Sequence, residues 1–125
     1  MTLVLDAGAL LAYDRGDRTV RAFLERAVRT GAEVRTTSGA VAQVWRNGAS
    51  QARLEMLLSG VLEVELGRSE SRRAGALLGV ARRADVVDAS VVDAATDGDE
   101  ILTSDPDDIA SLAWASGKTL IVTQV

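Results

Sequence analysis

The residues best suited to chemistry are three aspartates that lie at the ends of predicted secondary-structure elements. Asp6 directly follows a short apolar run of strand-forming residues, and Asp105 lies two residues after a strand predicted over 100–103. Asp88 falls in the first turn of a helix predicted over 85–95. In a parallel sheet the carboxyl ends of the strands share one edge, where ligands bind. Carboxylates gathered at one edge repel each other and usually need cations to neutralise them. The pattern therefore predicts a site for Mg²⁺ or Mn²⁺, which favour oxygen ligands.

Helix capping is an alternative role for the same three aspartates. Asp6 and Asp105 each precede a predicted helix, and aspartate is a preferred N-cap residue. Asp88 lies in a first turn, where the helix dipole favours a negative charge. Capping does not require placement at strand ends, however, and that shared placement favours the metal site.

The chain has no cysteine and no histidine, which excludes several classes of site. Disulfides, thiolate nucleophiles and zinc–thiolate centres need cysteine, and a Ser-His-Asp triad or an imidazole base needs histidine. Lys118 is the only lysine, so it is the single candidate for Schiff-base chemistry. If the protein is an enzyme, carboxylates must do the catalytic work.

Strand-like and helix-like segments alternate along the chain. Apolar residues recur at helical spacing in several segments, and short runs of strand-forming residues separate them. Helices are predicted in the Ala/Leu-rich stretch after Asp6, over 19–29, 38–47, 51–58, 69–83 and 85–95, and from Pro106. Strands are predicted over 3–5, 33–36, 61–66, 100–103 and 119–123. The alternation predicts a single α/β domain, residues 1–125, with a mainly parallel sheet of four to five strands and helices on both faces.

The net charge of −4 is unevenly distributed. Residues 1–84 hold 13 arginines and 9 acidic residues, whereas residues 85–125 hold one lysine and 9 acidic residues. Either this is an ordinary solvated surface, or an acidic metal pocket lies beside an arginine-rich surface that contacts phosphates. The arginines that flank the predicted helix 69–83 are Arg68, Arg72, Arg73, Arg82 and Arg83.

The apolar runs are too short for a membrane-spanning helix. The longest, such as 3–5 and 9–12, fall far below the roughly 18 residues that a span needs. No leader-like segment precedes Asp6. We therefore expect a cytoplasmic protein that does not contact a membrane.

Four short segments follow one another in an order and spacing that a known family shares. They are LVLDAGALLA at 3–12, VAQVWRNG at 41–48, DVVDASVVDAA at 85–95 and LTSDPDDI at 102–109. Together they resemble the PIN-domain family and, within it, the VapC toxins of type II toxin–antitoxin systems. The resemblance covers nearly the whole chain. It implies a PIN-like three-layer α/β/α fold and a ribonuclease whose acidic residues bind one or two divalent metal ions.

The resemblance also implies roles for individual residues and for partners. By position, Asp6, Asp88 and Asp105 match the metal-binding acidic residues of the family, with Asp108 as a helper. Water activated on Mg²⁺ or Mn²⁺ would hydrolyse an RNA phosphodiester and leave a 3′-hydroxyl and a 5′-phosphate. The implied partners are an RNA substrate, a cognate antitoxin and a second copy of the chain in a homodimer.

Gln43 stands where the family usually has a glutamate. An amide oxygen can still bind Mg²⁺ or orient a water, but it carries no charge and cannot act as a base. Three outcomes follow: weaker metal binding, a replacement carboxylate from Asp93 or Asp108, or a catalytically impaired PIN-fold protein that binds RNA or a partner. The sequence leaves these open, and an ordinary polar residue on a helix flank is a further alternative.

Other residues near the motifs have both a functional and a structural interpretation. Arg46 would contact an RNA phosphate or an antitoxin carboxylate, whereas Trp45 beside it continues the helical spacing that predicts a core position. Ser104 would approach the metal or a phosphate, or else end its strand and compete for the helix cap. Gly8 is expected to permit close packing near Asp6.

A phospho-receiver-like signalling domain also has aspartates at the strand ends of a parallel sheet. It usually needs two adjacent acids after the first strand, a phosphoacceptor aspartate after the third and a lysine after the fifth. Here Asp6 is alone, Leu66-Gly67 follows the third predicted strand and Lys118 precedes the last one. The pattern therefore favours the metal-dependent nuclease over the receiver.

Overall fold

The computed structural model describes residues 1–125, and its strands form one sheet. The strands are β1 (Thr2–Leu5), β2 (Glu33–Thr37), β3 (Leu62–Val64), β4 (Glu100–Thr103) and β5 (Ile121–Gln124). Their order is β3-β2-β1-β4-β5, and every neighbouring pair is parallel. Since β2 and β4 lie on opposite sides of β1, the strand order reverses between β1 and β4, the point where open parallel sheets bind ligands.

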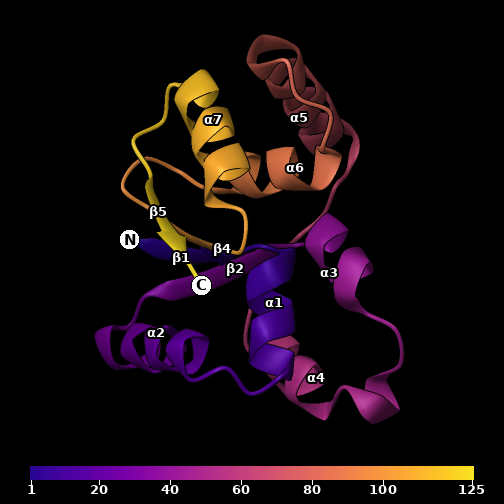
Figure 1. The fold of residues 1–125 in the computed structure, drawn as a ribbon, viewed down its shortest axis with the longest axis vertical. Helices are drawn as coiled ribbons and strands as arrows, with labels where there is room; N and C mark the ends of the chain where they lie inside the picture. The colour runs from indigo at the N-terminus through magenta and orange to yellow at the C-terminus, as the bar shows by residue number, and fades with distance from the viewer.

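Seven helices and a short 3₁₀ turn connect the strands. They are α1 (Ala7–Asp14), α2 (Arg18–Thr30), α3 (Ser38–Val44), η1 (Gly48–Ser50), α4 (Ala52–Ser59), α5 (Arg68–Ala81), α6 (Val86–Ala94) and α7 (Pro106–Ser116). Helices α1, α2 and α4 cover one face of the sheet and α5, α6 and α7 the other, while α3 lies beside α1 and α6 (Figure 1). The predicted α/β/α arrangement with a parallel sheet is confirmed.

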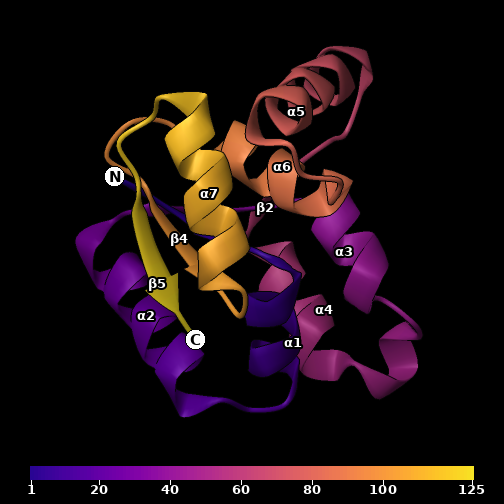
Figure 2. The same cartoon turned by 45° about the horizontal axis from the view of Figure 1, so that its top comes forward.

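The core forms where the central strands meet helices from both layers. Leu5 of β1 and Leu102 of β4 are fully buried, and they belong to one apolar cluster with Leu10 of α1 and Leu112 of α7. Burying a side chain of this size contributes roughly 1.5–3 kcal/mol. The same packing holds the beginnings of α1 and α7 against the carboxyl ends of β1 and β4, as the second view shows (Figure 2).

Local signals in the sequence set the ends of several helices. Asp17 accepts a hydrogen bond from the Val20 amide at 3.0 Å and so caps the start of α2, and Gly31 ends α2 in the left-handed conformation with φ of 71°. Pro106 occupies the first position of α7, where its missing amide hydrogen costs nothing. These features explain why most predicted helix bounds lie within a few residues of the observed ones.

One sequence-based prediction about local structure was right in kind but too long, and another was wrong. The strand predicted over 61–66 is shortened to Leu62–Val64, because Val64 pairs with Thr37 and β2 ends there, so the following residues have no strand to pair with. Trp45 is 37% exposed and not a core residue. Helix α3 ends at Val44, and the extended backbone of Trp45 turns its side chain away from the helical spacing.

No helix in the structure combines the length and apolar character that crossing a membrane requires.

Candidate metal centre

Asp6 lies at the switch point of the sheet and also caps a helix. Its backbone amide donates to the Leu102 carbonyl at 3.1 Å, which ties it to β4. One carboxylate oxygen accepts a hydrogen bond from the Ala9 amide at 2.8 Å, and only 4% of the residue is exposed. The capping role considered for Asp6 is therefore present, and it holds the carboxylate at the carboxyl edge of β1.

Asp88 is released from capping by its neighbour Asp85. The Asp85 carboxylate accepts a hydrogen bond from the Asp88 amide at 3.0 Å and caps α6. Asp88 is half-buried in the first turn of the same helix. Its side chain is therefore available for another partner.

Asp105 and Asp108 come from the beginning of α7. Asp105 occupies the N-cap position, but its side chain makes no capping bond; its own amide donates to the Thr103 hydroxyl at 2.8 Å. Residues three apart lie on the same face of a helix, which brings Asp108 next to Asp105. One carboxylate oxygen from each of Asp88, Asp105 and Asp108 lies within 4.8 Å of the other two. We call these three residues the acidic triad.

The carboxylates at this edge of the sheet repel one another when all of them are ionised. Burial, followed by the negative charges of Asp85, Asp105, Asp6 and Asp108, raises the pKa of Asp88 to about 7. Loss of solvent and then the hydrogen bond and charge of Asp108 raise the pKa of Asp105. Burial raises the pKa of Asp6, although hydrogen bonds from Thr103, Ala9, Ser104 and Gly8 oppose that shift. A cation at this edge would remove the repulsion.

An arginine that follows α5 pairs with the acidic triad. Arg83, just beyond the end of α5, contacts the Asp108 carboxylate at 3.1 Å and the Ser111 hydroxyl at 3.0 Å. Arg83, Asp85, Asp88 and Asp108 line a cavity of about 280 Å³ beside the triad. The cavity is therefore bordered by charges of both signs.

Of the predicted supporting residues, Asp93 is occupied elsewhere and Gln43 is exposed. Asp93 occupies the last turn of α6, where its carboxylate binds Arg73 at 2.9 Å, so it does not supply a replacement carboxylate at the triad. Gln43 is an exposed residue of α3 with no hydrogen bond from its side chain. Among the two residues proposed to compensate for Gln43, only Asp108 is at the site.

The other predicted residues have structural contacts that the sequence alone did not reveal. The Arg46 guanidinium donates to the Trp45 carbonyl at 2.7 Å and to the Ala42 carbonyl at 3.4 Å, at the end of α3. Ser104 is exposed and packs against Gly8; a Cβ atom at Gly8 would lie 1.9 Å from the Ser104 hydroxyl oxygen. The expectation of close packing at Gly8 is confirmed, and it brings α1 against the loop that carries Asp105.

The donor set fits a hard divalent cation. Every side chain at the cluster offers carboxylate oxygen, which Mg²⁺ and Mn²⁺ prefer over nitrogen or sulfur. Because its pKa is raised to about 7, the Asp88 carboxylate takes up a proton near neutral pH when no cation offsets the negative charges around it. The acidic triad would hold the ion, with Asp6 next to it.

Two sets of contacts could not be predicted from the sequence. The Arg83–Asp108 pair joins residues 25 positions apart, and only the packing of α5 against α7 brings them together. Lys118 donates from Nζ to the carbonyls of Val92, Asp93 and Ala95 at 2.7–3.1 Å. The only lysine therefore stabilises the last turn of α6, at the end opposite Asp88.

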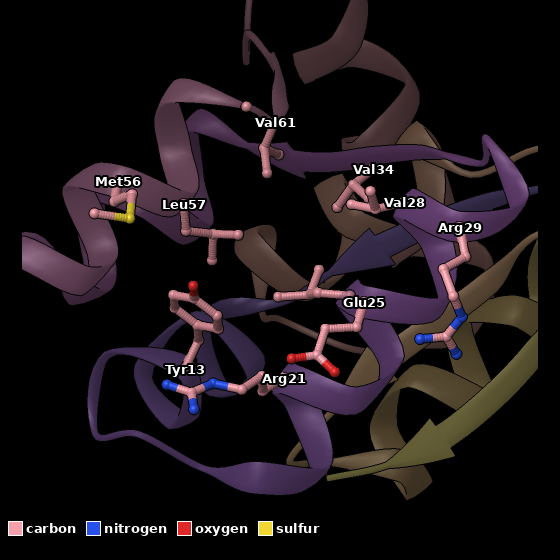
Figure 3. Close-up of a pocket in the computed structure, with 11 residues that line it drawn as sticks. Tyr13, Arg21, Glu25, Val28, Arg29, Val34, Met56, Leu57 and Val61 are labelled. Atoms are coloured by element: carbon pink, nitrogen blue, oxygen red, sulfur yellow. The ribbon is translucent and has the colours of Figure 1, made fainter.

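An apolar groove lies in the other helix layer, between α2 and α4. It has a volume of about 570 Å³, and Figure 3 shows Tyr13, Val34 and Leu57 around its interior, with charged residues of α2 along its rim. Val28 is 80% exposed and Met56 72% exposed at its borders. Apolar side chains exposed together on a surface are typical of a binding site for another protein.

Comparison with known proteins gives a match in structure only. No protein-family model matches the chain, and no curated protein sequence matches it. A chain in the crystal structure of VapBC2 from Rickettsia felis, bound to a DNA fragment from their promoter, is similar with a TM-score of 0.68 and 12% sequence identity. The similarity covers 100% of this chain and 99% of that one. The chain therefore has a PIN-like three-layer α/β fold, with its acidic triad at the carboxyl edge of the sheet.

Proposed function

We propose that the protein is a Mg²⁺- or Mn²⁺-dependent endoribonuclease of the VapC toxin type. The observation that carries the proposal is the acidic triad, three carboxylates within 4.8 Å of one another at the switch point of a PIN-like fold. The similar chain in the VapBC2 complex supports the choice of fold family. The absence of histidine and cysteine agrees with a mechanism that relies on carboxylates.

Each residue of the site has a defined part in this mechanism. Asp88, Asp105 and Asp108 would hold the ion. Asp6, whose carboxylate is fixed by the Ala9 amide, would lie beside the ion at the end of β1. When bound, the metal supplies an acidified water and offsets the negative charge that develops on the phosphate. Arg83, which pairs with Asp108, would contact a phosphate of the substrate if Asp108 held the cation.

RNA cleavage by matched aspartate variants tests this proposal. We choose Asp105→Asn because Asp105 makes no capping bond, so its loss spares α7, whereas Asp6 caps α1. Asp107→Asn removes the same charge from an exposed neighbour outside the triad and serves as the control. With structured RNA such as tRNA in Mn²⁺, we expect the wild type and Asp107→Asn to cleave, and Asp105→Asn to be slower by about 100-fold or more. Equal cleavage by all three, or none by the wild type in Mg²⁺ or Mn²⁺, would overturn the proposal.

A second candidate is a PIN-fold protein that binds RNA or a partner without cleaving it. The observation that favours it is Gln43, an uncharged residue in place of the usual glutamate, whose side chain is exposed. Calorimetric titration with Mn²⁺ separates the two functions. Tight binding together with RNA cleavage supports the nuclease, and absence of metal binding supports the binding protein.

We further propose that a small antitoxin covers the apolar groove between α2 and α4. The groove exposes Val28 and Met56, and the similar chain comes from an assembly of VapBC2 with a promoter DNA fragment. An apolar helix or strand of the antitoxin would bury these side chains.

Sedimentation velocity on the chain alone measures whether two copies pair, as the proposed homodimer requires. The Met56→Asp variant is expected to abolish antitoxin binding without changing this pairing.

A further inference from the structure

Trp114 is the most exposed large apolar residue of the protein. It lies in the last turn of α7 with 89% of its surface exposed, and Val80 of α5 beside it is 71% exposed. The chain contains only two tryptophans, one tyrosine and one phenylalanine. A tryptophan buries more apolar area than any other residue, and a stable fold usually covers it. An uncovered indole therefore points to a ligand that supplies the missing cover.

The indole borders a groove between α5 and α7. Val80, Ala81, Ala110, Ala115 and Trp114 give the groove apolar walls, Arg83 and Ser111 supply its polar atoms, and its volume is about 730 Å³. Both helices lie on the face of the sheet that also carries α6 (Figure 1). The small alanine side chains leave room for a flat ring against the indole.

Arg83 links this groove to the acidic triad. Arg83 lines both the groove and the cavity beside Asp88, and its guanidinium bridges Asp108 of the triad and Ser111 of the groove. Trp114 follows Asp108 by six residues on α7, which corresponds to about 9 Å along the helix axis. A ligand held at the triad therefore passes Arg83 before it reaches Trp114.

The chemistry along this path alternates between charge and a flat apolar surface. Arg83 lies between the carboxylates and the indole, and the exposed Arg82 lines the cavity beside the triad. Arginine binds phosphate through charge-assisted hydrogen bonds, and a cation at the triad would also attract phosphate. The indole can stack on an unpaired base, because aromatic side chains stack on bases whatever their sequence. A protein segment would match the apolar walls as well, but Arg83 at the border of the groove and of the triad suits a ligand that carries a phosphate beside an apolar ring.

We propose that the groove between α5 and α7 binds an unpaired base of an RNA strand, stacked on Trp114, while Arg83 contacts the adjoining phosphate. The inference rests on the proposed function, because the strand is the substrate of the acidic triad. It narrows the substrate class to RNA that is single-stranded on the side of the cut facing α7. A base within a duplex cannot reach the indole, since it is already stacked and paired.

Tryptophan fluorescence tests the stacking directly. In a Trp45→Phe, Asp105→Asn protein, Trp114 is the only indole and cleavage is suppressed under the proposed function. We expect a ten-nucleotide oligouridylate to quench its emission and the corresponding RNA duplex to quench it far less. Fluorescence anisotropy with a labelled strand measures affinity: Trp114→Ala, in the Asp105→Asn protein, is expected to weaken binding about 10-fold. Trp114→Tyr retains a ring and should recover most of the affinity, and Trp45→Phe should change it little.

Several outcomes would overturn the base site. One is strand binding detected by anisotropy without any quenching of Trp114. Another is an unchanged affinity in Trp114→Ala together with the loss of a dimer in sedimentation velocity, which would assign the groove to a second copy. Because Trp114 is exposed, the alanine variant should melt within a few degrees of the parent, and thermal unfolding checks this.

The test separates this inference from the proposed nuclease. Cleavage by the wild type with an unchanged kcat/KM in Trp114→Ala would overturn the base site and leave the nuclease standing. Quenching by the oligouridylate without cleavage by the wild type would support the base site and overturn the nuclease.

Discussion

Helix α6 has aspartates at both ends, and their surroundings differ. Near its last turn, Asp93 pairs with Arg73 at 2.9 Å, and Lys118 donates to three backbone carbonyls. In the loop that follows, the buried Asp99 accepts hydrogen bonds from the Thr2 and Thr96 amides at 2.9 and 2.8 Å. At the first turn, Asp88 faces other carboxylates, and its pKa is raised to about 7.

The comparison separates structural acids from candidate functional ones. A buried carboxylate that accepts several hydrogen bonds is stabilised in its charged form and holds the fold together. A carboxylate that faces other carboxylates is destabilised in its charged form, and a bound proton or cation is needed to stabilise it. The protein therefore provides within one helix both the site and its internal control, and three predictions test the distinction.

The largest effect is expected from neutralising one acid at each end of α6. Asp88→Asn removes a ligand from the acidic triad, and we expect the affinity for Mn²⁺ to fall by about 100-fold or more. Asp93→Asn loses only an ion pair whose arginine is exposed, so the affinity should stay within about twofold. Isothermal titration calorimetry measures both variants. Similar losses in the two variants would contradict the assignment of the ion to the first turn of α6.

An intermediate effect is expected from Asp99→Ala, which concerns stability. The variant leaves two amides and the Thr96 hydroxyl without their acceptor at a residue that is 3% exposed, and we expect a loss of about 2 kcal/mol in the free energy of unfolding. Urea denaturation measures it. Asp107→Ala, which removes an exposed carboxylate with no hydrogen bond, should change stability by less than about 0.5 kcal/mol.

The pH dependence of Asp99 follows from its hydrogen bonds. Burial acts to raise its pKa, but the bonds from Thr96 and Thr2 prevail, and the net pKa is lowered from 3.8. Its contribution is therefore present above about pH 4 and is lost as the pH falls through the lowered value. If Asp99→Ala were as stable as the wild type at pH 7, the structural role of this carboxylate would be refuted.

The smallest effect is expected from the pH dependence of stability in the absence of metal. For Asp88 its sign is opposite to that for Asp99. The pKa of Asp88 rises from 3.8 to about 7 on folding, so the folded protein binds the proton more tightly than the unfolded chain does. Stability should then decline as pH rises from 4 to 7 and level off above that. The effect is modest because Asp88 is only half-buried and water screens its charge.

Melting temperatures at pH 5 and pH 8 measure this trend. In a metal-free buffer we expect the lower value at pH 8, and a shallower trend in Asp88→Asn. Saturating Mn²⁺ should reverse the order, since the ion needs deprotonated carboxylates. A wild type that melts at the same temperature at both pH values, with and without Mn²⁺, would show that the triad is neither strained nor a metal site.

The location of the candidate site was largely readable in the sequence. Asp6 and Asp105 follow strands, and Asp88 opens a helix, because hydrophobic periodicity reveals where elements begin and end. Capping was harder to assign, since an aspartate before a helix caps it in one case and not in another. Asp6 does so, whereas the side chain of Asp105 makes no capping bond and Asp85 takes that role for α6.

Local propensity and periodicity were enough to predict the α/β alternation, the parallel sheet and the strand-end position of two aspartates. Which carboxylates meet depends instead on the packing of the helices: Asp108 joins the triad and Asp93 does not. The same packing places Arg83, which reaches Asp108 where α5 lies against α7. Side-chain partners distant in sequence depend on how helices cross and rotate, and a single sequence carries no local signal of that geometry.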